Sequence, residues 1–175
     1  MIGIWSVPYS KQGDINYYLD WYYLGTDGVM QTGWIKLDDN RWYYFGSDGR
    51  IVYGWKKISG KWYYFVPPTD TSAEALQHVK NGTPKENCYM VSGWKQIDGI
   101  WYYFKTDGSM AANEYCGGYW LGASGAWTYQ HKAQWKKDSK GWYYQDSTGW
   151  YAKNCKLTID GKEYNFNTAG YCTNP

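Results

Sequence analysis

Short runs of aromatic residues recur along the chain, separated by polar stretches rich in Gly and Asp. The phrase Trp-Tyr-Tyr-Phe occurs at 42–45, 62–65 and 101–104, with a looser copy at 21–24 and Trp-Tyr-Tyr at 142–144. Aromatic residues favour β-strands, in which side chains alternate between the two faces. Each phrase is therefore predicted to be a strand, with its first and third residues on one face and its second and fourth on the other.

A Gly-Trp pair precedes each full copy of the phrase, with its Trp seven or eight residues upstream. The pairs are Gly33-Trp34, Gly54-Trp55 and Gly93-Trp94. Dipeptides such as Ser59-Gly60 and Asp98-Gly99 lie between the two segments and supply the positive φ that tight hairpins need. Each Gly-Trp segment is thus predicted to pair with the phrase that follows it as a β-hairpin.

The phrase belongs to a longer repeated unit. Counted from its first residue, a Gly follows seven positions later and a Met or another bulky residue nine positions later, except in the copy that begins at Trp62. This count also reveals two units without a Trp pair, in which Glu114 and Cys155 are expected where the Gly-Trp tryptophan would be. The seven units begin at Trp21, Trp42, Trp62, Trp101, Gly118, Trp142 and Glu163.

A fixed period of about one hairpin is typical of a solenoid, in which each unit buries its surface on its neighbours. The steps from Trp21 to Trp42 and from Trp34 to Trp55 are both 21 residues. An isolated two-stranded hairpin is marginal in water, so stacking must provide the stability. We predict an all-β fold, a solenoid (superhelix) of stacked β-hairpins, in a single repeat domain of about seven units spanning 1–175.

The third unit is interrupted between its phrase and Gly93. Two prolines stop the strand, and Thr71-Ser72-Ala73-Glu74 has the signature of a capping box that opens a helix, which Gly82 would end. Residues 66–89 are therefore predicted to be an insertion with one short helix. A surface elaboration and a partner-binding segment are both compatible with it.

Composition and charge exclude several classes of protein. The 175 residues include 13 Trp and 21 Tyr but only four Phe, so Trp and Tyr must supply most of the buried area. A net charge of +2 without a basic cluster gives no support for nucleic-acid binding. No apolar run approaches the ~18 residues of a membrane span, and the N-terminal residues lack the features of a signal peptide. If the natural protein is secreted, we expect this chain to be a mature fragment or an excised domain.

The cysteines favour disulfides over metal binding. No Cys-x-x-Cys pair is present and the only histidines are His78 and His131, so no metal site or cofactor is expected. Disulfides would indicate an oxidising compartment. Three connectivities are possible, and proximity in sequence favours Cys88–Cys116 and Cys155–Cys172.

The repeat is predicted to bring three aromatic rings to the joints between hairpins. The Gly-Trp tryptophan would lie beside the first Trp of the phrase, and the first Tyr of the next phrase would face this pair. Such a cage attracts a quaternary ammonium by cation–π contacts worth about 0.5–2 kcal/mol each. The predicted triplets are Trp34, Trp42 and Tyr63; Trp55, Trp62 and Tyr102; Trp94, Trp101 and Tyr119; and Trp135, Trp142 and Tyr164.

Weaker predictions accompany the four triplets. Trp21 with Tyr43 would form a partial site, and Met90 and Met110 could floor neighbouring sites, since a thioether packs readily on aromatic rings. Simple packing is the alternative for any single ring, because Trp and Tyr at a strand period most often only pack. Core positions are predicted for Phe45, Phe65, Phe104 and Phe166.

The pattern Gly-Trp, four to six residues, Trp-Tyr-Tyr-Phe, Asp-Gly, Met, Gly-Trp resembles the choline-binding or cell-wall-binding repeat of Gram-positive surface proteins and phage lysins. The likeness covers nearly the whole chain except residues 66–89 and parts of the N-terminal loop, and departs at Glu114, Gly118, Cys155 and Glu163. The resemblance implies a superhelix of hairpins that binds choline on teichoic acids through the four triplets. It also implies a secreted or cell-surface protein.

Other functions remain as alternatives at this stage. Related repeats bind carbohydrate, and flat aromatic platforms stack on sugar rings, so a glycan-binding module is the main rival. Catalysis is not expected, because no Ser-His-Asp or Cys-His set is visible and most Asp residues precede Gly in turns. A passive spacer is a third interpretation, and whether the chain forms a homodimer through an end hairpin stays open.

Overall fold

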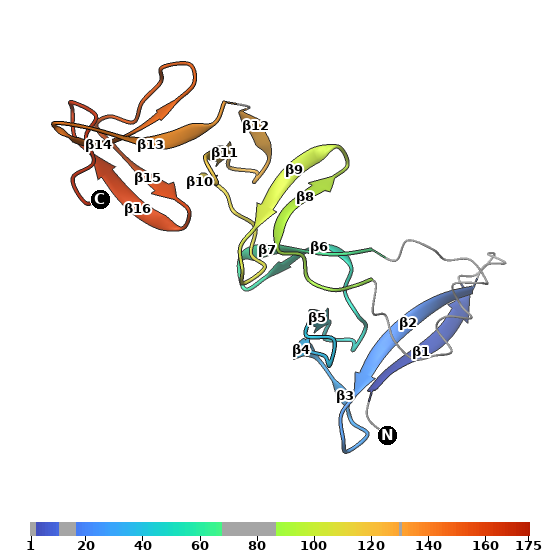
Figure 1. Cartoon of the computed structure of the whole chain (residues 1–175). Helices are drawn as coiled ribbons and strands as arrows, with labels where there is room; N and C mark the ends of the chain where they lie inside the picture. Colours follow the sequence, from blue (N-terminus) through green and yellow to red (C-terminus); the bar gives the residue numbers. More distant parts are fainter. Residues whose placement is uncertain (1–2, 11–16, 68–86, 130) are drawn as a thin grey trace. The chain divides into compact units, whose positions relative to one another are not determined.

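The computed structural model describes residues 3–10, 17–67, 87–129 and 131–175 (Figure 1). All regular elements in these ranges are β-strands, so none of them is a helix that could cross a membrane. The helix predicted at 71–82 lies outside the described residues. Residue contacts divide the chain into two compact units, Met1–Val91 and Ser92–Pro175. That the chain forms a single domain stays a prediction.

The first unit contains three antiparallel hairpins. Its seven strands are β1 (Gly3–Ser10), β2 (Tyr17–Leu24), β3 (Met30–Gln31), β4 (Gly33–Lys36), β5 (Trp42–Phe45), β6 (Gly54–Ile58) and β7 (Lys61–Phe65). β1 and β2 form a long first hairpin that β3 extends, and β4–β5 and β6–β7 each form a two-stranded sheet.

The second unit contains four hairpins. Its nine strands are β8 (Gly93–Ile97), β9 (Ile100–Phe104), β10 (Glu114–Cys116), β11 (Tyr119–Leu121), β12 (Trp127–Tyr129), β13 (Ala133–Asp138), β14 (Gly141–Asp146), β15 (Cys155–Ile159) and β16 (Lys162–Phe166). The predicted all-β fold of hairpin repeats is confirmed, since each aromatic phrase is the second strand of a hairpin.

Each hairpin continues into a return segment that runs back along its second strand. In the second repeat, Ile51 bridges Phe45, and the N–H of Val52 donates to the carbonyl of Tyr44 at 2.8 Å. The turn between them is closed by Gly49, whose N–H donates to the carbonyl of Gly46 at 2.9 Å. Gly49 has a φ of 79°, a left-handed conformation that glycine adopts without steric cost.

In the third repeat, the insertion replaces this turn. The N–H of Cys88 donates to the carbonyl of Val66 at 2.6 Å, and Phe65 bridges Met90. Met90 therefore takes the place that Ile51 has in the preceding repeat. The insertion leaves the strand pairing of its repeat intact because its two ends are held side by side.

One backbone hydrogen bond recurs between successive hairpins. Its donor is the N–H of a residue on a return segment, and its acceptor is the carbonyl of the Trp that opens the phrase of the preceding repeat. The pairs are Ile51 to Trp21, Met90 to Trp42 and Cys172 to Trp142, at 2.9, 2.8 and 2.7 Å. At these three joints, the bond fixes where the new hairpin meets the one before it.

Side chains reinforce the stacking at the turn glycines. A Cβ added to Gly49 would overlap Met30, and one added to Gly125 would overlap Met110. The bulky residue of one repeat thus packs on the turn of the next. Gly49 and Gly125 are therefore required for two reasons, namely a left-handed backbone and the close approach of a neighbouring side chain.

The phenylalanines form the centre of each stack. Phe45, Phe65 and Phe104 are fully buried and Phe166 nearly so, which confirms their predicted core positions. Full burial of such a side chain contributes about 1.5–3 kcal/mol relative to an exposed one. The hydrophobic core is therefore a row of small clusters along each unit.

The strand register corrects the alignment of the two repeats without a Trp pair. In an intact repeat, Trp55 pairs with Tyr64 and Gly54 with Phe65. In the two repeats without a Trp pair, Tyr115 pairs with Trp120 and Lys156 pairs with Asn165. Trp120 and Asn165 are the third residues of their phrases, as Tyr64 is, so Tyr115 and Lys156 occupy the position that Trp55 has in the intact repeat. Glu114 and Cys155 occupy the Gly position and not, as predicted, the Trp position.

These two repeats also join in one sheet. β10 pairs with β15 in parallel through Tyr115 and Ile159, which gives a five-stranded sheet in the order β12-β11-β10-β15-β16. The N–H of Asp160 donates to the carbonyl of Tyr115 at 2.8 Å and strengthens this junction. The other described hairpins of the second unit are two-stranded sheets.

The predicted Cys155–Cys172 disulfide is wrong, because both cysteines are free thiols. Cys155 and Cys172 both pair with Phe166, from opposite sides. Two strands that flank a third lie about 9–10 Å apart, beyond the ~7 Å between Cα atoms that a disulfide allows. Cys88 and Cys116 lie in hydrophobic clusters of different units, so their pairing stays a prediction. Burial raises the pKa of each of these two thiols to about 12.

The packing of Met110 on Gly125 can be tested by comparison with an open glycine. Gly125→Ala should lower the free energy of unfolding by about 1–2 kcal/mol for the left-handed backbone and a further ~1–3 kcal/mol for the overlap. Gly149 holds the equivalent turn position with open space around it, so Gly149→Ala should show only the first cost. Urea unfolding measures both variants. Equal losses would contradict the proposed packing role.

Candidate functional site

The first predicted triplet is assembled within the first unit. The ring centroids of Trp34 on β4 and Trp42 on β5 are 6.4 Å apart, and the rings are nearly perpendicular at 88°. Tyr63 on β7 lies 5.0 Å from Trp34 at 67°. The hairpin register explains this arrangement, because Trp34 and Trp42 are diagonal neighbours on one face. The next hairpin then brings Tyr63 to the pair.

The last predicted triplet repeats this geometry in the second unit. Trp135 and Trp142 are 6.5 Å apart at 89°, and Tyr164 lies 4.8 Å from Trp135 at 66°. Tyr164 belongs to a repeat that lost its own Trp pair. That repeat nevertheless places a ring against the pair of the preceding hairpin, as predicted.

The third triplet is more crowded than predicted. Tyr119 lies 5.8 Å from Trp94, and Trp127 on β12 lies 6.1 Å from Trp94 and 5.1 Å from Tyr119. Trp101 is on the neighbouring strand β9 and is 38% exposed. The sequence prediction missed Trp127. A signal was present, because Trp127 follows the first residue of its phrase by nine positions, as the candidate site residue Met110 does in the preceding repeat.

The structure defines the Trp pair of the second triplet but not its closure by Tyr102. Trp55 and Trp62 are 6.3 Å apart at 90°, so the Trp pair has the same geometry as the others. Tyr102 belongs to the other compact unit. The closure of this pair by Tyr102 therefore stays a prediction.

The outer Trp of each pair keeps an accessible ring. The exposed fractions are 41% for Trp42, 42% for Trp62 and 40% for Trp142. A cation–π contact extends to ~6 Å from the ring centroid. If one cation lies about 4.5 Å above the faces of two perpendicular rings, the two centroids are about 6.4 Å apart. The observed Trp pairs, at 6.3–6.5 Å, match this corner. Edge-to-face contact with a Tyr closes one side without covering the outer ring.

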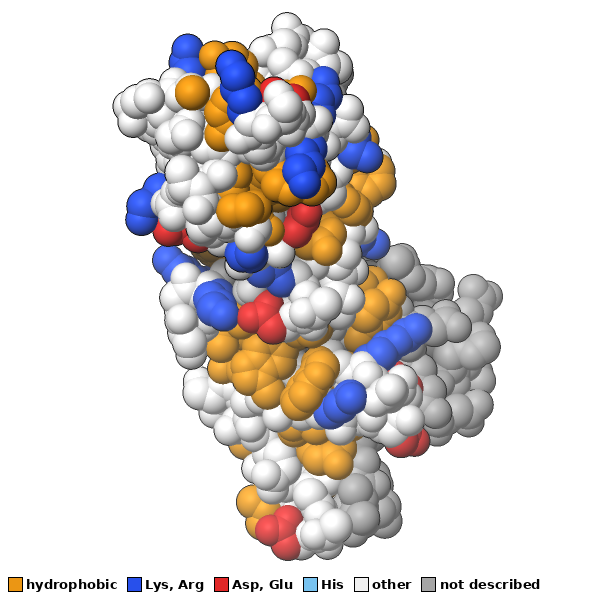
Figure 2. Space-filling model, turned by 60° about the vertical axis from the view of Figure 1, so that its left-hand side comes forward, with side chains coloured by type: hydrophobic (Ala, Val, Ile, Leu, Met, Phe, Trp, Pro, Cys, Tyr) orange, Lys and Arg blue, Asp and Glu red, His pale blue; other side chains and the backbone are white. Residues whose placement is uncertain are grey.

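Lysines of the chain already approach these rings. The Nζ atoms of Lys36, Lys57 and Lys137 lie over Trp42, Trp62 and Trp142, at 6.0, 5.9 and 5.3 Å from the ring centroids. Each lysine is directly across the hairpin from its Trp. Figure 2 shows apolar side chains at the surface with Lys and Arg beside them. The outer rings are therefore reachable by a cation.

The partial site predicted at Trp21 and Tyr43 has no exposed ring. Tyr43 is fully buried and Trp21 is 9% exposed, and both pack in the same core cluster. The Tyr43 hydroxyl donates to Asp39 Oδ2 at 2.7 Å, and burial together with this carboxylate raises the pKa of Tyr43 above its usual value. In the structure, these two residues stabilise the fold.

The two methionines predicted as site floors have different positions. Met90 packs beside Tyr63 and Tyr44, next to the first triplet. Met110 packs against the turn at Gly125. Met90 thus stays a candidate for the floor of a site, whereas the contacts of Met110 indicate a structural role.

Two family models match this chain. One, a cell wall binding repeat, matches residues 92–110 and 134–149, and the other, a choline-binding repeat, matches residues 12–52 and 37–70. Together they span more than half of the chain. No curated protein sequence matches it.

Solved structures of choline-binding proteins are also similar. A structure of CbpF in complex with ipratropium is 30% identical with a TM-score of 0.54, and the match covers 99% of this chain and 49% of that one. A structure of choline binding protein F from Streptococcus pneumoniae is 34% identical with a TM-score of 0.49, and the match covers 89% of this chain and 44% of that one. A structure of CbpJ from Streptococcus pneumoniae TIGR4 is 34% identical with a TM-score of 0.49, and the match covers 91% of this chain and 47% of that one.

The chain therefore spans about half the length of the solved structures it matches. The matched models, the hairpin repeats and the recurring perpendicular Trp pairs all agree. The chain belongs to the choline-binding, cell-wall-binding repeat family.

Proposed function

We propose that this chain is a non-catalytic module that attaches a protein to choline-bearing polymers of the bacterial surface. The observation that carries the proposal is the perpendicular Trp pair with a third aromatic ring against it, which recurs at Trp34 and at Trp135. Ring faces that meet in a corner present their negative potential to a single point. A compact quaternary ammonium fits such a point.

The corner geometry favours a cation over a sugar ring. A pyranose stacks on one flat, open ring, whereas here the second Trp stands at 88–90° to the first. Family membership supports the same ligand class. A glycan-binding module is the alternative function for the same aromatic rings.

Attachment would depend on several sites acting together. One cage with two or three cation–π contacts, at about 0.5–2 kcal/mol each, binds a choline group weakly. A polymer that carries many choline groups can occupy several cages at once, so the second and later contacts are intramolecular and increase avidity. The repeat of the triplet along the chain suits a repetitive ligand.

Two of the cysteines are held in their neutral form. Ionised thiols are the nucleophilic form of cysteine, and burial keeps the pKa of Cys88 and Cys116 near 12. Within the described ranges, no three His, Cys, Asp or Glu residues gather as a metal site. We infer a location at the cell surface for the whole protein.

Counting bound choline tests the assignment of individual rings. Trp42→Ala should lower the number of choline molecules bound at saturation by one per chain, because it removes one wall of the first cage. Trp150→Ala is a matched control, since both side chains are 41% exposed but Trp150 lies outside the triplets. Equilibrium dialysis gives the counts. An unchanged count for Trp42→Ala, or an equal loss for Trp150→Ala, would refute the assignment.

A neutral analogue tests the role of the positive charge. Choline should quench Trp fluorescence saturably, whereas 3,3-dimethyl-1-butanol, which has a carbon in place of the nitrogen, should bind at least about tenfold more weakly. Equal affinities would mean that the cages recognise only apolar shape. Quenching by oligosaccharides but not by choline would favour the glycan-binding alternative.

A further inference from the structure

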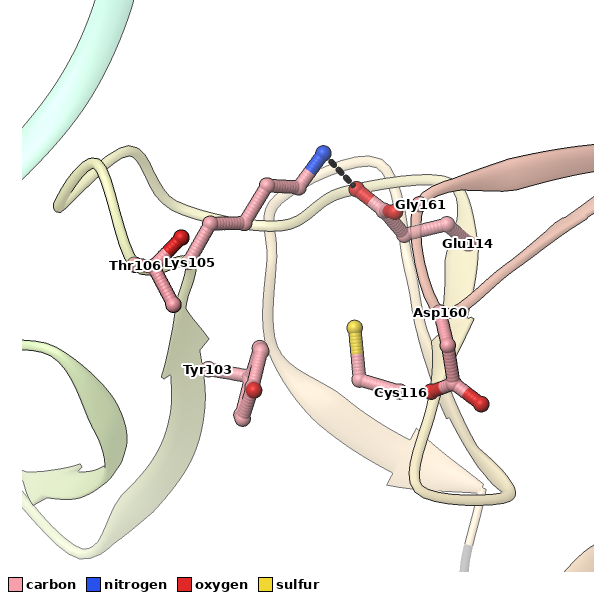
Figure 3. Close-up of a pocket in the computed structure, with 7 residues that line it drawn as sticks. All are labelled: Tyr103, Lys105, Thr106, Glu114, Cys116, Asp160 and Gly161. Atoms are coloured by element: carbon pink, nitrogen blue, oxygen red, sulfur yellow. Dashed lines mark ion pairs between the residues drawn. The ribbon is translucent and has the colours of Figure 1, made fainter.

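The second unit contains a cavity that none of the aromatic triplets explains. Its volume is about 260 Å³, and it lies where β9, β10 and the tip of the β15–β16 hairpin meet (Figure 3). The lining includes the side chains of Tyr103, Lys105, Thr106, Glu114, Cys116 and Asp160. Two of the three repeats that line it are those without a Trp pair.

The parallel junction between β10 and β15 holds the walls of this cavity in place. The N–H of Gly117 donates to Asp160 Oδ1 at 2.7 Å, and the N–H of Asp160 donates to the carbonyl of Tyr115 at 2.8 Å. The tip of the last hairpin is thereby fixed against a repeat that precedes it by two units. The cavity is a preformed feature of this sheet.

A buried carboxylate in the cavity lacks one partner. Glu114 is 4% exposed, and its Oε1 atom forms an ion pair with Lys105 Nζ at 2.6 Å, drawn in Figure 3. Its Oε2 atom is buried and has no hydrogen-bond partner among the described residues. Buried polar atoms are nearly always hydrogen-bonded, so this oxygen calls for a donor from outside the protein.

The lining is suited to hydroxyl groups and not to a choline cage. Among the described residues, Tyr103 is the only aromatic side chain of the lining, so they form no three-ring cage there. Carboxylates of Glu114 and Asp160 accept hydrogen bonds, whereas Lys105 and Thr106 donate them. Burial, followed by the charges of Glu114 and Asp160, raises the pKa of Cys116 to about 12, so this thiol is neutral at physiological pH.

The size of the cavity limits the ligand. Ligand pockets usually span about 300–1,000 Å³, and this one is slightly smaller. It has room for one ring and its substituents, but not for a longer polymer segment. A ring with several hydroxyl groups offers both the donors and the acceptors that the walls require.

We propose that this cavity is a saccharide site for a single pyranose ring, with one hydroxyl donating to Glu114 Oε2, another to the Asp160 carboxylate, and the ring against Tyr103. The site differs from the aromatic cages and does not depend on choline binding. The chain would thus recognise two chemical groups, a quaternary ammonium between hairpins and a sugar at the junction of its two altered repeats.

Saturation-transfer NMR on the full chain tests the proposal with methyl glucoside, methyl galactoside and N-acetylglucosamine. The sample contains saturating choline, so that sugar contacts at the aromatic cages are blocked. At least one sugar should receive saturation from the protein. If none of the three does, or if water alone occupies the cavity in a crystal soaked with them, the proposal is refuted.

Two substitutions locate the site, and a third is the control. Glu114→Gln keeps the shape of the side chain and should lower the affinity for the sugar at least about tenfold, because a charged acceptor is lost. Asp160→Asn keeps an acceptor for Gly117 and tolerates the left-handed backbone at φ 51°, so it should fold even if the first variant does not. Asp160→Asn should also lower the affinity for the sugar.

Glu163→Gln is the matched control, because Glu163 forms an exposed ion pair with Lys156 at 3.2 Å and is not among the residues that line the cavity. It should leave the sugar affinity unchanged. Choline counts should be the same in all three variants, which separates this site from the proposed cages. Sugar binding that survives both Glu114→Gln and Asp160→Asn would overturn the assignment.

Discussion

The hydrogen bond from a return segment to the carbonyl of the preceding Trp determines where neighbouring hairpins meet. It recurs at Trp21, Trp42 and Trp142 at 2.7–2.9 Å, even where the insertion of the third repeat separates donor and phrase. Because the acceptor belongs to the Trp that opens each phrase, the bond places this residue at the joint. The next hairpin then adds its Tyr beside the Trp pair. The register of each hairpin sets the Trp pair, and this contact sets where the next hairpin meets it.

The rings divide into two groups with different roles. Phe45, Phe65 and Phe104 are fully buried and hold each stack together, as expected where single hairpins are marginally stable. Trp42, Trp62 and Trp142 remain about 40% exposed and contribute less to burial. A smaller aliphatic residue would serve the fold equally well at such positions. Their perpendicular arrangement is best explained by ligand binding, and the lysines over them show that a cation can reach these faces.

Sequence spacing could predict the local features but not the distant ones. The hairpins, the core phenylalanines and the meeting of Trp34 with Tyr63 follow from strand alternation and a constant period. The Cys155–Cys172 disulfide was wrong because proximity in sequence ignored the strand that lies between them. The predicted alignment of Glu114 with the Gly-Trp tryptophan was wrong by one residue, because the β10–β11 hairpin has only three-residue strands and Tyr115 takes that position. The parallel pairing of Tyr115 with Ile159, and hence the cavity at Glu114, has no signal in a local repeat.

A crystal structure of the chain with bound choline tests the central claim most directly. The account predicts a trimethylammonium group in the corner between Trp34 and Trp42 and another between Trp135 and Trp142, each bordered by the Tyr of the next hairpin. The rings should keep their perpendicular arrangement. Choline bound elsewhere, or Trp corners that stay empty at saturating choline, would contradict the account.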